Sequence, residues 1–345
     1  MAVVCVIKPN KNFMLMKKSI SLFTVLSMLI LIGVYSCKKE NGCAGPPKVR
    51  AGNDTTLANV TTVTLKGTTD AQSGTWSIVE GQGGTIDNSK TPAQFTGALD
   101  NVYKLKLEST NDCGTASDEL IINLVNAGAD MTVNELVSNM HWIQQSCFRI
   151  EGSKFKIYTD PVSISGTDQA DIILITHPHG DHFSPADIDK LVTSKTILIA
   201  PGDCNYTGKV GARVYLGPGN TYTAFGAVKI TAVPAYNIVK TQNHPRSNNW
   251  VGYVVTINGV TFYTAGDTER VPEMKNITTD IAMLPLGQTY TFNTVAEAAE
   301  AAKDTKAKVA IPMHFGLYEG TEADASTFQN LLSGSMKVVI KTKGG

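Results

Sequence analysis

The sequence lacks a surplus of charge of either sign: 30 Lys and Arg residues balance 30 Asp and Glu residues over 345 positions. Proteins that bind nucleic acid through its phosphate backbone carry a basic excess, so we expect no nucleic-acid partner. The Gly-x-Ser-x-Gly motif of serine hydrolases is missing, and the glycine-rich residues 81–84 lack the Gly-Lys-Ser/Thr ending of a P-loop. Serine-nucleophile chemistry and P-loop nucleotide binding therefore have no support in the sequence.

The apolar run at the N-terminus, residues 20–34, is too short for a bilayer span, which needs about 20 apolar residues. It follows Lys17 and Lys18 and ends at VYSC, so it has the order of a secretory signal. VYSC resembles a bacterial lipobox, in which Cys37 is lipidated and becomes the mature N-terminus. A plain signal peptide or a short anchor helix is the alternative. We predict a signal peptide over residues 1–36, a tether over 37–47, and a lipid-anchored protein of the bacterial cell envelope.

Cysteine is scarce, with six residues in the chain. Cys5 lies upstream of the predicted signal, and Cys37 is assigned to the lipid. The remaining cysteines divide between two predicted modules: Cys43, Cys113, Cys147 and Cys204. Disulfides persist in an oxidising compartment, but the spacing does not determine the pairing.

Residues 48–127 show short stretches of alternating apolar and polar residues, separated by Gly, Asn, Asp and Thr. This texture predicts a small antiparallel β-sandwich. Trp76, Tyr103, Leu105 and Leu107 are its expected core residues. AGNDTT, GTWSIVEGQGGTI and CGTASDE resemble the immunoglobulin-like (PKD-like) modules of bacterial surface proteins, so we expect a spacer.

Residues 130–345 have a different texture, in which apolar strands alternate with helix patterns. Strands are predicted at 170–176, 196–200, 280–286 and 309–316, helices at 184–194 and 294–307, and a hairpin at 250–267. Asn258 and Gly259 form the favoured dipeptide for the turn of that hairpin. Ser184 and Pro185 are suited to the start of the first helix. This alternation predicts an α/β domain with mixed sheets.

Histidine is also sparse, yet three of the six histidines fall in THPHGDHFSP, residues 176–185. His177, His179 and His182, with Asp181 between them, come directly after the predicted buried strand. A strand end is a rigid platform from which a short loop can direct several side chains to one point. Imidazole and carboxylate are common metal ligands, so the loop predicts a metal site.

HPHGDH resembles the His-x-His-x-Asp-His signature of the metallo-β-lactamase superfamily. YTAGDT resembles its second signature, whose aspartate (here Asp267) bridges two metals, and IPMHFG resembles the strand that carries a second-metal ligand, here His314. IYTDP, VPAYN, HPR, AGDTERVPEM and PLGQTYT are most similar to the branch of ascorbate-phosphate lactonases and related hydrolases. The resemblance implies an αββα sandwich over residues 130–345.

One ligand position departs from the common pattern of the superfamily. Where many members have a further histidine for the first metal, this chain has Tyr236 and Asn237. Either His244 reaches in from a longer loop, or Asn237 acts as a weak oxygen ligand. We favour His244, because imidazole binds borderline metals better than a neutral amide does.

The resemblance implies a hydrolase that binds one or two divalent ions, zinc first, with manganese or iron as alternatives. Metal-activated hydroxide would cleave an ester, lactone or phosphoester bond of a small-molecule substrate. Asp181 and Asp267 are the expected catalytic carboxylates, and Tyr236, Asn237 and Tyr290 the expected substrate-binding residues. Two other classes stay open: a non-catalytic, metal-stabilised cell-surface binding module, and a redox domain similar to di-iron relatives.

Overall fold

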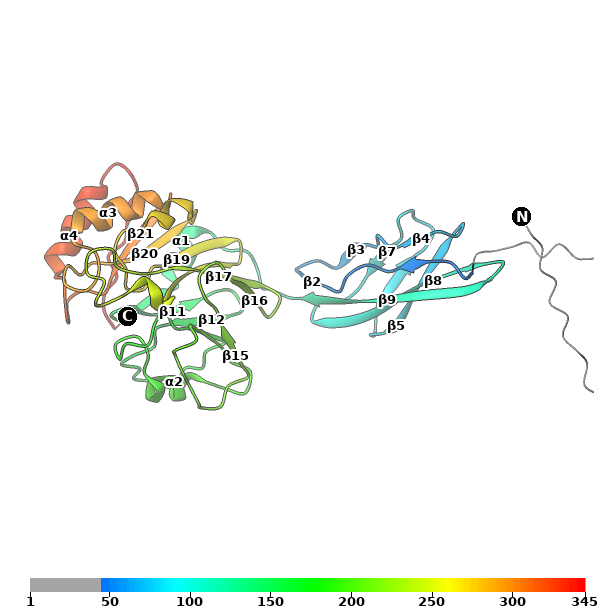
Figure 1. Ribbon diagram of the computed structural model, residues 1–345, viewed down its shortest axis with the longest axis horizontal. Coiled ribbons are helices and arrows are strands. Elements are labelled where there is room, and N and C mark those ends of the chain that lie inside the picture. Colours follow the sequence, from blue (N-terminus) through cyan, green and yellow to red (C-terminus); the bar gives the residue numbers. More distant parts are fainter. Residues whose placement is uncertain (1–44, 345) are drawn as a thin grey trace, which may run out of the picture. The chain divides into compact units, whose positions relative to one another are not determined.

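The structure is a computed structural model that describes residues 45–344 (Figure 1). The predicted signal peptide, most of the tether, and Cys37 and Cys43 lie outside the described residues. Among the described residues, no helix has both the length and the apolar character needed to cross a bilayer. Cys113 is disulfide-bonded, whereas Cys147 and Cys204 are buried free thiols.

Residues 48–127 contain strands and no helix. The strands are β1 (Val49–Arg50), β2 (Thr55–Ala58), β3 (Thr62–Thr64), β4 (Thr68–Thr69), β5 (Gly74–Glu80), β6 (Thr85–Asp87), β7 (Gln94–Thr96), β8 (Asn101–Asn111) and β9 (Gly114–Val125). They form a four-stranded sheet (β2-β9-β8-β5), a three-stranded sheet (β3-β7-β6) and the pair β1-β4. The four predicted core residues, Trp76, Tyr103, Leu105 and Leu107, are buried as expected. The likeness to immunoglobulin modules stays a prediction.

The rest of the chain contains two larger sheets, and in each the strands lie in chain order. The six-stranded sheet consists of β10 (Met140–Gln144), β11 (Cys147–Glu151), β12 (Lys156–Thr159), β13 (Ile172–Leu174), β14 (Ile197–Ala200) and β15 (Ala212–Tyr215). The seven-stranded sheet consists of β16 (Thr221–Ala224), β17 (Val228–Pro234), β18 (Val251–Ile257), β19 (Val260–Thr264), β20 (Ile281–Pro285), β21 (Val309–Met313) and β22 (Lys337–Val338).

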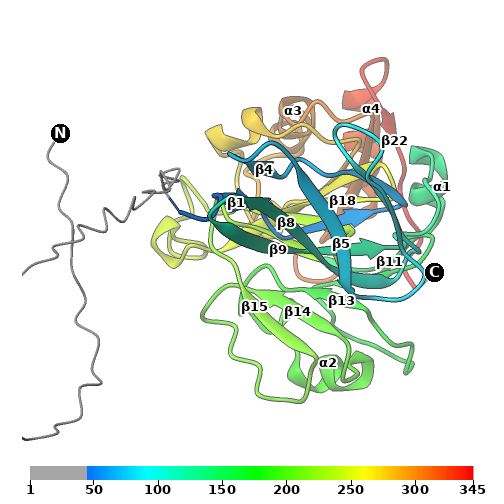
Figure 2. The same cartoon turned by 90° about the vertical axis from the view of Figure 1, so that its right-hand side faces the viewer.

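Short helices cover the outer faces of these sheets. They are α1 (Val133–Ser138), α2 (Pro185–Leu191), α3 (Val295–Asp304) and α4 (Glu322–Leu332), with two 3-10 turns at Arg246–Asn248 and Pro272–Asn276. Helices α3 and α4 pack on the seven-stranded sheet, and α2 lies on the opposite side, next to the six-stranded sheet (Figure 2). The predicted αββα sandwich is confirmed, and it is rich in strand.

Strand β13 shows why this packing follows from the sequence. Ile172 and Leu174 belong to the core between the two sheets, whereas Ile173 belongs to the cluster beneath α2. Successive side chains of a strand point to opposite faces, so a strand that is buried on both faces reads as a continuous apolar run. This is the run that the sequence shows before THPHGDH.

The predicted helix start and hairpin turn are also confirmed. The Ser184 hydroxyl accepts a hydrogen bond from the backbone N–H of Asp187, with Pro185 at the first helical position. Asn258 and Gly259, between β18 and β19, have φ values of 48° and 79°, as a type I′ turn requires. Helix α3 buries four alanines against the sheet, as its composition predicts: Ala298, Ala299, Ala301 and Ala302.

The topology brings three chain segments to one edge of the sandwich. Strands β12, β13 and β14 run parallel, as do β19, β20 and β21, so their carboxyl ends meet at a common edge in each sheet. The loop after β13 carries residues 177–182, the loop after β19 carries Asp267, and the loop after β21 carries His314.

Candidate metal centre

A tight turn gathers the three histidines that follow β13. The backbone carbonyl of His179 accepts hydrogen bonds from the N–H groups of His182 (2.9 Å) and Phe183 (2.8 Å). This turn folds the chain back at Gly180. As a result His177 and His182 are buried, while His179 is more accessible and lines a pocket.

One group of donors consists of His177, His179 and His244, whose ligand atoms all lie within 4.8 Å of one another. His177 Nε2 and His179 Nδ1 are 3.1 Å apart. Asp267 Oδ2 lies 3.5 Å from His244 Nε2 and 4.0 Å from His177 Nε2. We call these three histidines the first cluster.

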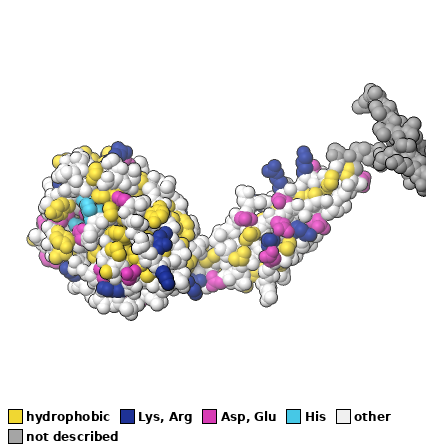
Figure 3. Space-filling view, turned by 60° about the horizontal axis from the view of Figure 1, so that its bottom comes forward, with side chains coloured by type: hydrophobic (Ala, Val, Ile, Leu, Met, Phe, Trp, Pro, Cys, Tyr) yellow, Lys and Arg dark blue, Asp and Glu magenta, His cyan; other side chains and the backbone are white. Residues whose placement is uncertain are grey.

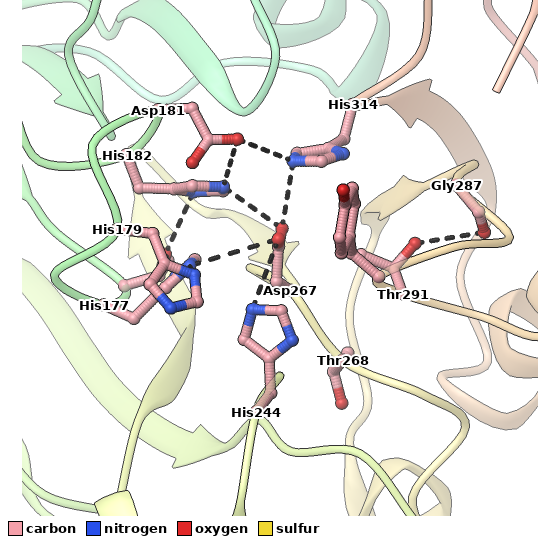
Figure 4. Close-up of polar contacts among 12 residues, drawn as sticks. His177, His179, Asp181, His182, His244, Asp267, Thr268, Gly287, Thr291 and His314 are labelled. Atoms are coloured by element: carbon pink, nitrogen blue, oxygen red, sulfur yellow. Dashed lines mark hydrogen bonds and ion pairs between the residues drawn. The ribbon is translucent and has the colours of Figure 1, made fainter. Parts of the chain in front are cut away.

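The second cluster consists of Asp181, His182 and His314, which satisfy the same distance limit. His314 Nε2 is 3.5 Å from Asp181 Oδ2, and His182 Nε2 is 3.7 Å from it. The other oxygen of Asp267, Oδ1, lies 3.3 Å from His182 Nε2 and 3.4 Å from His314 Nε2. Asp267 thus stands between the clusters and presents one oxygen to each (Figure 4).

The structure places His244, and not Asn237, in the first cluster. The backbone N–H of Asn237 donates to the carbonyl of His244 (2.8 Å), which brings the tip of the intervening loop back to the strand end. The side-chain amide of Asn237 donates to the carbonyl of Tyr290 (2.7 Å). Asn237 therefore supports the loops around His244.

The donor set fits a divalent cation. His182 Nε2, His244 Nε2 and Asp267 Oδ1 are buried and have no hydrogen-bond partner in the described structure. A buried polar atom without a partner costs about 1–3 kcal/mol. Three such atoms around the Asp267 carboxylate indicate a site for a cation, which accepts lone pairs from its ligands. Burial lowers the pKa of His177, which favours the neutral imidazole that binds metal. Although burial alone would raise it, His182 and His314 hold the pKa of Asp267 well below its ordinary value.

Asp160, which was not expected from the sequence, orients one histidine of each cluster: His182 directly, and His177 through the Thr176 hydroxyl. Its buried carboxylate accepts hydrogen bonds from His182 Nδ1 (2.8 Å), from the Thr176 hydroxyl (2.8 Å) and from the Thr176 N–H (2.7 Å). Because the Thr176 hydroxyl donates its proton to Asp160, its oxygen is free to accept a hydrogen bond from the Nδ1–H of His177 (2.9 Å). Both imidazoles are then held through Nδ1 with Nε2 directed at the clusters, which is the orientation that metal binding at Nε2 requires.

Glu319 and Gln145 were missed as well, and both contact His314. Glu319 Oε1 is 3.1 Å from His314 Nδ1, and Gln145 Nε2 is 3.2 Å from His314 Nε2. Gln145, Asp160 and His314 all have positive φ values, of 49°, 40° and 55°. Non-glycine residues rarely adopt this conformation, and such strain is concentrated at functional sites. IYTDP contains Asp160 but gave no sign of its role, and nothing in the sequence singled out Glu319 or Gln145.

A pocket of about 460 Å³ opens above the clusters, and its wall includes Asp181, Asp267 and the predicted residue Tyr290. Tyr236 and Asn237, which we also expected at the substrate, are not among the lining residues. The Tyr236 hydroxyl donates instead to Glu273 Oε2 (3.0 Å), and Arg246 lies over its ring. The Asn237 amide contacts His244 Nδ1 (3.3 Å) and the carbonyl of Tyr290 (2.7 Å), so it supports two lining residues without lining the pocket itself. The structure therefore gives no support to a direct contact of Tyr236 or Asn237 with the substrate.

Comparison with known proteins agrees with this geometry. A family described as the β-lactamase superfamily domain matches residues 139–314. A UPF0173 metal-dependent hydrolase of Pyrococcus furiosus is 32% identical over 219 residues, which cover 59% of this chain and 96% of that protein. The corresponding protein of Thermococcus kodakarensis is 33% identical over the same shares.

Among solved structures, a metal-dependent hydrolase from Parabacteroides distasonis is 37% identical, with a TM-score of 0.53 over 59% of this chain and 92% of that one. Each of these relatives matches 59% of this chain and more than nine-tenths of its own length. This chain therefore belongs to the β-lactamase superfamily and, within it, to the family of UPF0173 metal-dependent hydrolases.

Proposed function

We propose that the domain hydrolyses an ester, lactone or phosphoester bond of a small molecule with the help of one or two divalent ions. The observation that carries this proposal is the position of Asp267, whose two oxygens face two separate donor clusters at the floor of one pocket. His177, His179 and His244 would hold one ion, and Asp181, His182 and His314 the other. Zinc suits the imidazole-rich set best, with manganese and iron as alternatives.

When bound, such ions supply a nucleophile at neutral pH and stabilise negative charge on the substrate. The chain's own residues would position the reactants. Burial opposes ionisation of Asp181, but contacts with His314 and His182 lower its pKa to about 2, so it is a carboxylate at neutral pH. Asp181 also lines the pocket, where it would accept a hydrogen bond from the attacking water. Asp160 would keep His177 and His182 in the tautomer that the ions require.

A metal assay combined with a substrate screen tests this proposal. The purified chain should contain zinc, manganese or iron and should cleave nitrophenyl esters, lactones or nitrophenyl phosphodiesters. Chelation should abolish turnover, and added metal should restore it, whereas Asp181→Asn should retain the fold and lose most activity. Bound metal with no turnover would favour the non-catalytic binding module, and oxygen-dependent chemistry would favour the redox alternative. Turnover that is indifferent to chelators would refute the proposal.

The N-terminal part of the chain supports a second, independent proposal about location. The VYSC junction supports lipidation at Cys37 and attachment to the bacterial cell envelope through that lipid. The strands between residues 48 and 127 would then act as a spacer of the immunoglobulin type between the tether and the hydrolase domain at 130–345. This placement rests on sequence patterns alone.

A further inference from the structure

Apolar side chains are exposed around the mouth of the pocket. Between residues 130 and 344, the structure exposes seven large hydrophobic side chains, and five of them fall in three short loops. They are Ile238, Val239, Tyr290, Leu317 and Tyr318, which we call the apolar rim. Tyr290 and Tyr318 line the pocket itself. Figure 3 shows hydrophobic side chains beside histidines on this domain.

Hydrogen bonds between the loops show that the rim is one surface. Asn237, next to the first rim residues, donates its side-chain amide to the carbonyl of Tyr290 (2.7 Å). Glu319, next to Tyr318, accepts the backbone N–H groups of Thr289 (2.9 Å) and Tyr290 (2.6 Å). The three loops are therefore tied together at their bases, and the rim is held in place beside the clusters.

The pocket lining contains no lysine or arginine among the described residues. Lys240, next to the rim residue Val239, is mostly buried: its Nζ donates to the carbonyl of Gln288 (3.2 Å) and lies 3.9 Å from Glu269 Oε1. Carboxylate and phosphate groups of ligands are usually held by Arg or Lys side chains.

We infer that the substrate is an uncharged carboxylic ester, open or cyclic, whose apolar arm packs on Tyr290 and Tyr318. The inference rests on the proposed function and narrows it. Hydrolysis forms a bond between a water oxygen and the carbonyl carbon and breaks the bond from that carbon to the leaving oxygen. The leaving oxygen receives one water proton, so the products are a carboxylic acid and an alcohol, or a single hydroxy acid when the ester is cyclic. The apolar arm would bind outside the reacting centre and fix the carbonyl above the clusters.

The inference is tested with the metal-loaded, full-length protein and four chromogenic substrates. Nitrophenyl hexanoate carries an apolar arm, nitrophenyl acetate a minimal one, the nitrophenyl half-ester of succinate a charged one, and a nitrophenyl phosphodiester replaces the carbonyl. We expect kcat/KM to be greatest for the hexanoate. Tyr318→Ala should lower kcat/KM for the hexanoate about tenfold, mainly through KM, and leave the acetate within about twofold. Tyr215→Ala is the matched control, because Tyr215 is an exposed tyrosine outside the pocket.

The possible outcomes separate this inference from the proposed function. A preference for the succinate half-ester or the phosphodiester would overturn the inference and leave a metal-dependent hydrolase. An equal loss of kcat/KM for the hexanoate in Tyr318→Ala and Tyr215→Ala would also overturn it. So would a Tyr318→Ala protein whose preference for the hexanoate over the acetate is unchanged. If the Tyr318→Ala protein with unchanged selectivity also sedimented as a monomer where the wild type sediments as a dimer, the apolar rim would be a contact between two copies of this chain. Absence of any chelator-sensitive turnover would remove both proposals.

Discussion

Replacement of Asp160 by asparagine should weaken metal binding while leaving the backbone intact. Asparagine tolerates the positive φ of 40° at this position as aspartate does, and it has nearly the same shape. Its amide, however, offers one acceptor oxygen and an NH₂ group with two donors, where the carboxylate offers two acceptor oxygens. If the oxygen keeps the Thr176 N–H, the NH₂ group faces His182 Nδ1 and the Thr176 hydroxyl.

That exchange reverses the proton positions on two imidazoles. His182 Nδ1 must then accept a hydrogen bond, so its proton moves to Nε2, the atom that faces Asp267. The Thr176 hydroxyl turns to donate to His177 Nδ1, with the same consequence for His177 Nε2. Loss of a partner that orients a metal-binding histidine typically costs about 10- to 100-fold in metal affinity. This corresponds to about 1.4–2.7 kcal/mol at each cluster.

The cost to the fold should be smaller, because Thr176 keeps both contacts: its N–H donates to the amide oxygen, and its hydroxyl accepts from the NH₂ group. We expect the free energy of unfolding of the metal-free protein to fall by only about 1 kcal/mol. Three charge-assisted hydrogen bonds become neutral, but the cost of burying the Asp160 charge is removed at the same time. Asp171→Asn is the matched control: the Asp171 carboxylate accepts a hydrogen bond from the Lys156 N–H (2.8 Å) at the opposite end of the same strands.

Two measurements check this reasoning. Competition with a chromogenic chelator gives the metal affinity of the wild type, Asp160→Asn and Asp171→Asn, and urea unfolding of the metal-free proteins gives their stability. Only Asp160→Asn should lose affinity. An Asp160→Asn protein that binds metal within about twofold of the wild type would show that the tautomers are not set by this carboxylate.

Three further predictions follow from other parts of the chain. His244→Ala should lose the ion of the first cluster and retain the other, whereas Asn237→Ala should keep both by elemental analysis; the reverse result would make Asn237 the ligand. Burial raises the pKa of Asp187, but hydrogen bonds from the side chains of Lys190 and Ser184 and from two backbone N–H groups outweigh burial. They hold the pKa of Asp187 below its ordinary value of 3.8. A depressed pKa stabilises the fold above pH 3.8 and loses that effect as the pH falls. Asp187→Asn should therefore lower the unfolding free energy by about 1–3 kcal/mol at pH 7, with an effect that shrinks as the pH falls below 3.8, and equal stability at pH 7 would contradict this. Labelling with a palmitate analogue should disappear in Cys37→Ala, and labelling that persists would disprove the lipid anchor.

The sequence was most informative where chemistry is local. His177, His179, Asp181 and His182 fall within six positions, so their common purpose is visible without a fold. The helix start at Ser184 is equally local, because a cap needs only neighbours along the chain. Asp267 and His314 required the family resemblance, because their link to the loop exists only in three dimensions.

The open choices, unsupported roles and omissions have the opposite origin. The choice between His244 and Asn237 depends on how a loop returns to its own strand, and no local pattern encodes that return. Tyr236 was expected in the pocket from its position in the family pattern, yet its hydroxyl donates to Glu273 on another segment. Asp160 and Glu319 act through the imidazoles of residues at other positions in the chain. A supporting carboxylate of this kind is recognised only when its histidine partner lies beside it.

The assignment of donors to sheets explains why the site needs the whole sandwich. His177, His179, Asp181 and His182 come from the six-stranded sheet, whereas His244, Asp267 and His314 come from the seven-stranded sheet. Each cluster includes donors from both sheets, so neither sheet can complete a site alone. The packed core between the sheets, which includes Leu174 and Tyr253, therefore fixes the distances among the donors. By linkage, an ion that binds only to the assembled site must also stabilise the packing of one sheet on the other.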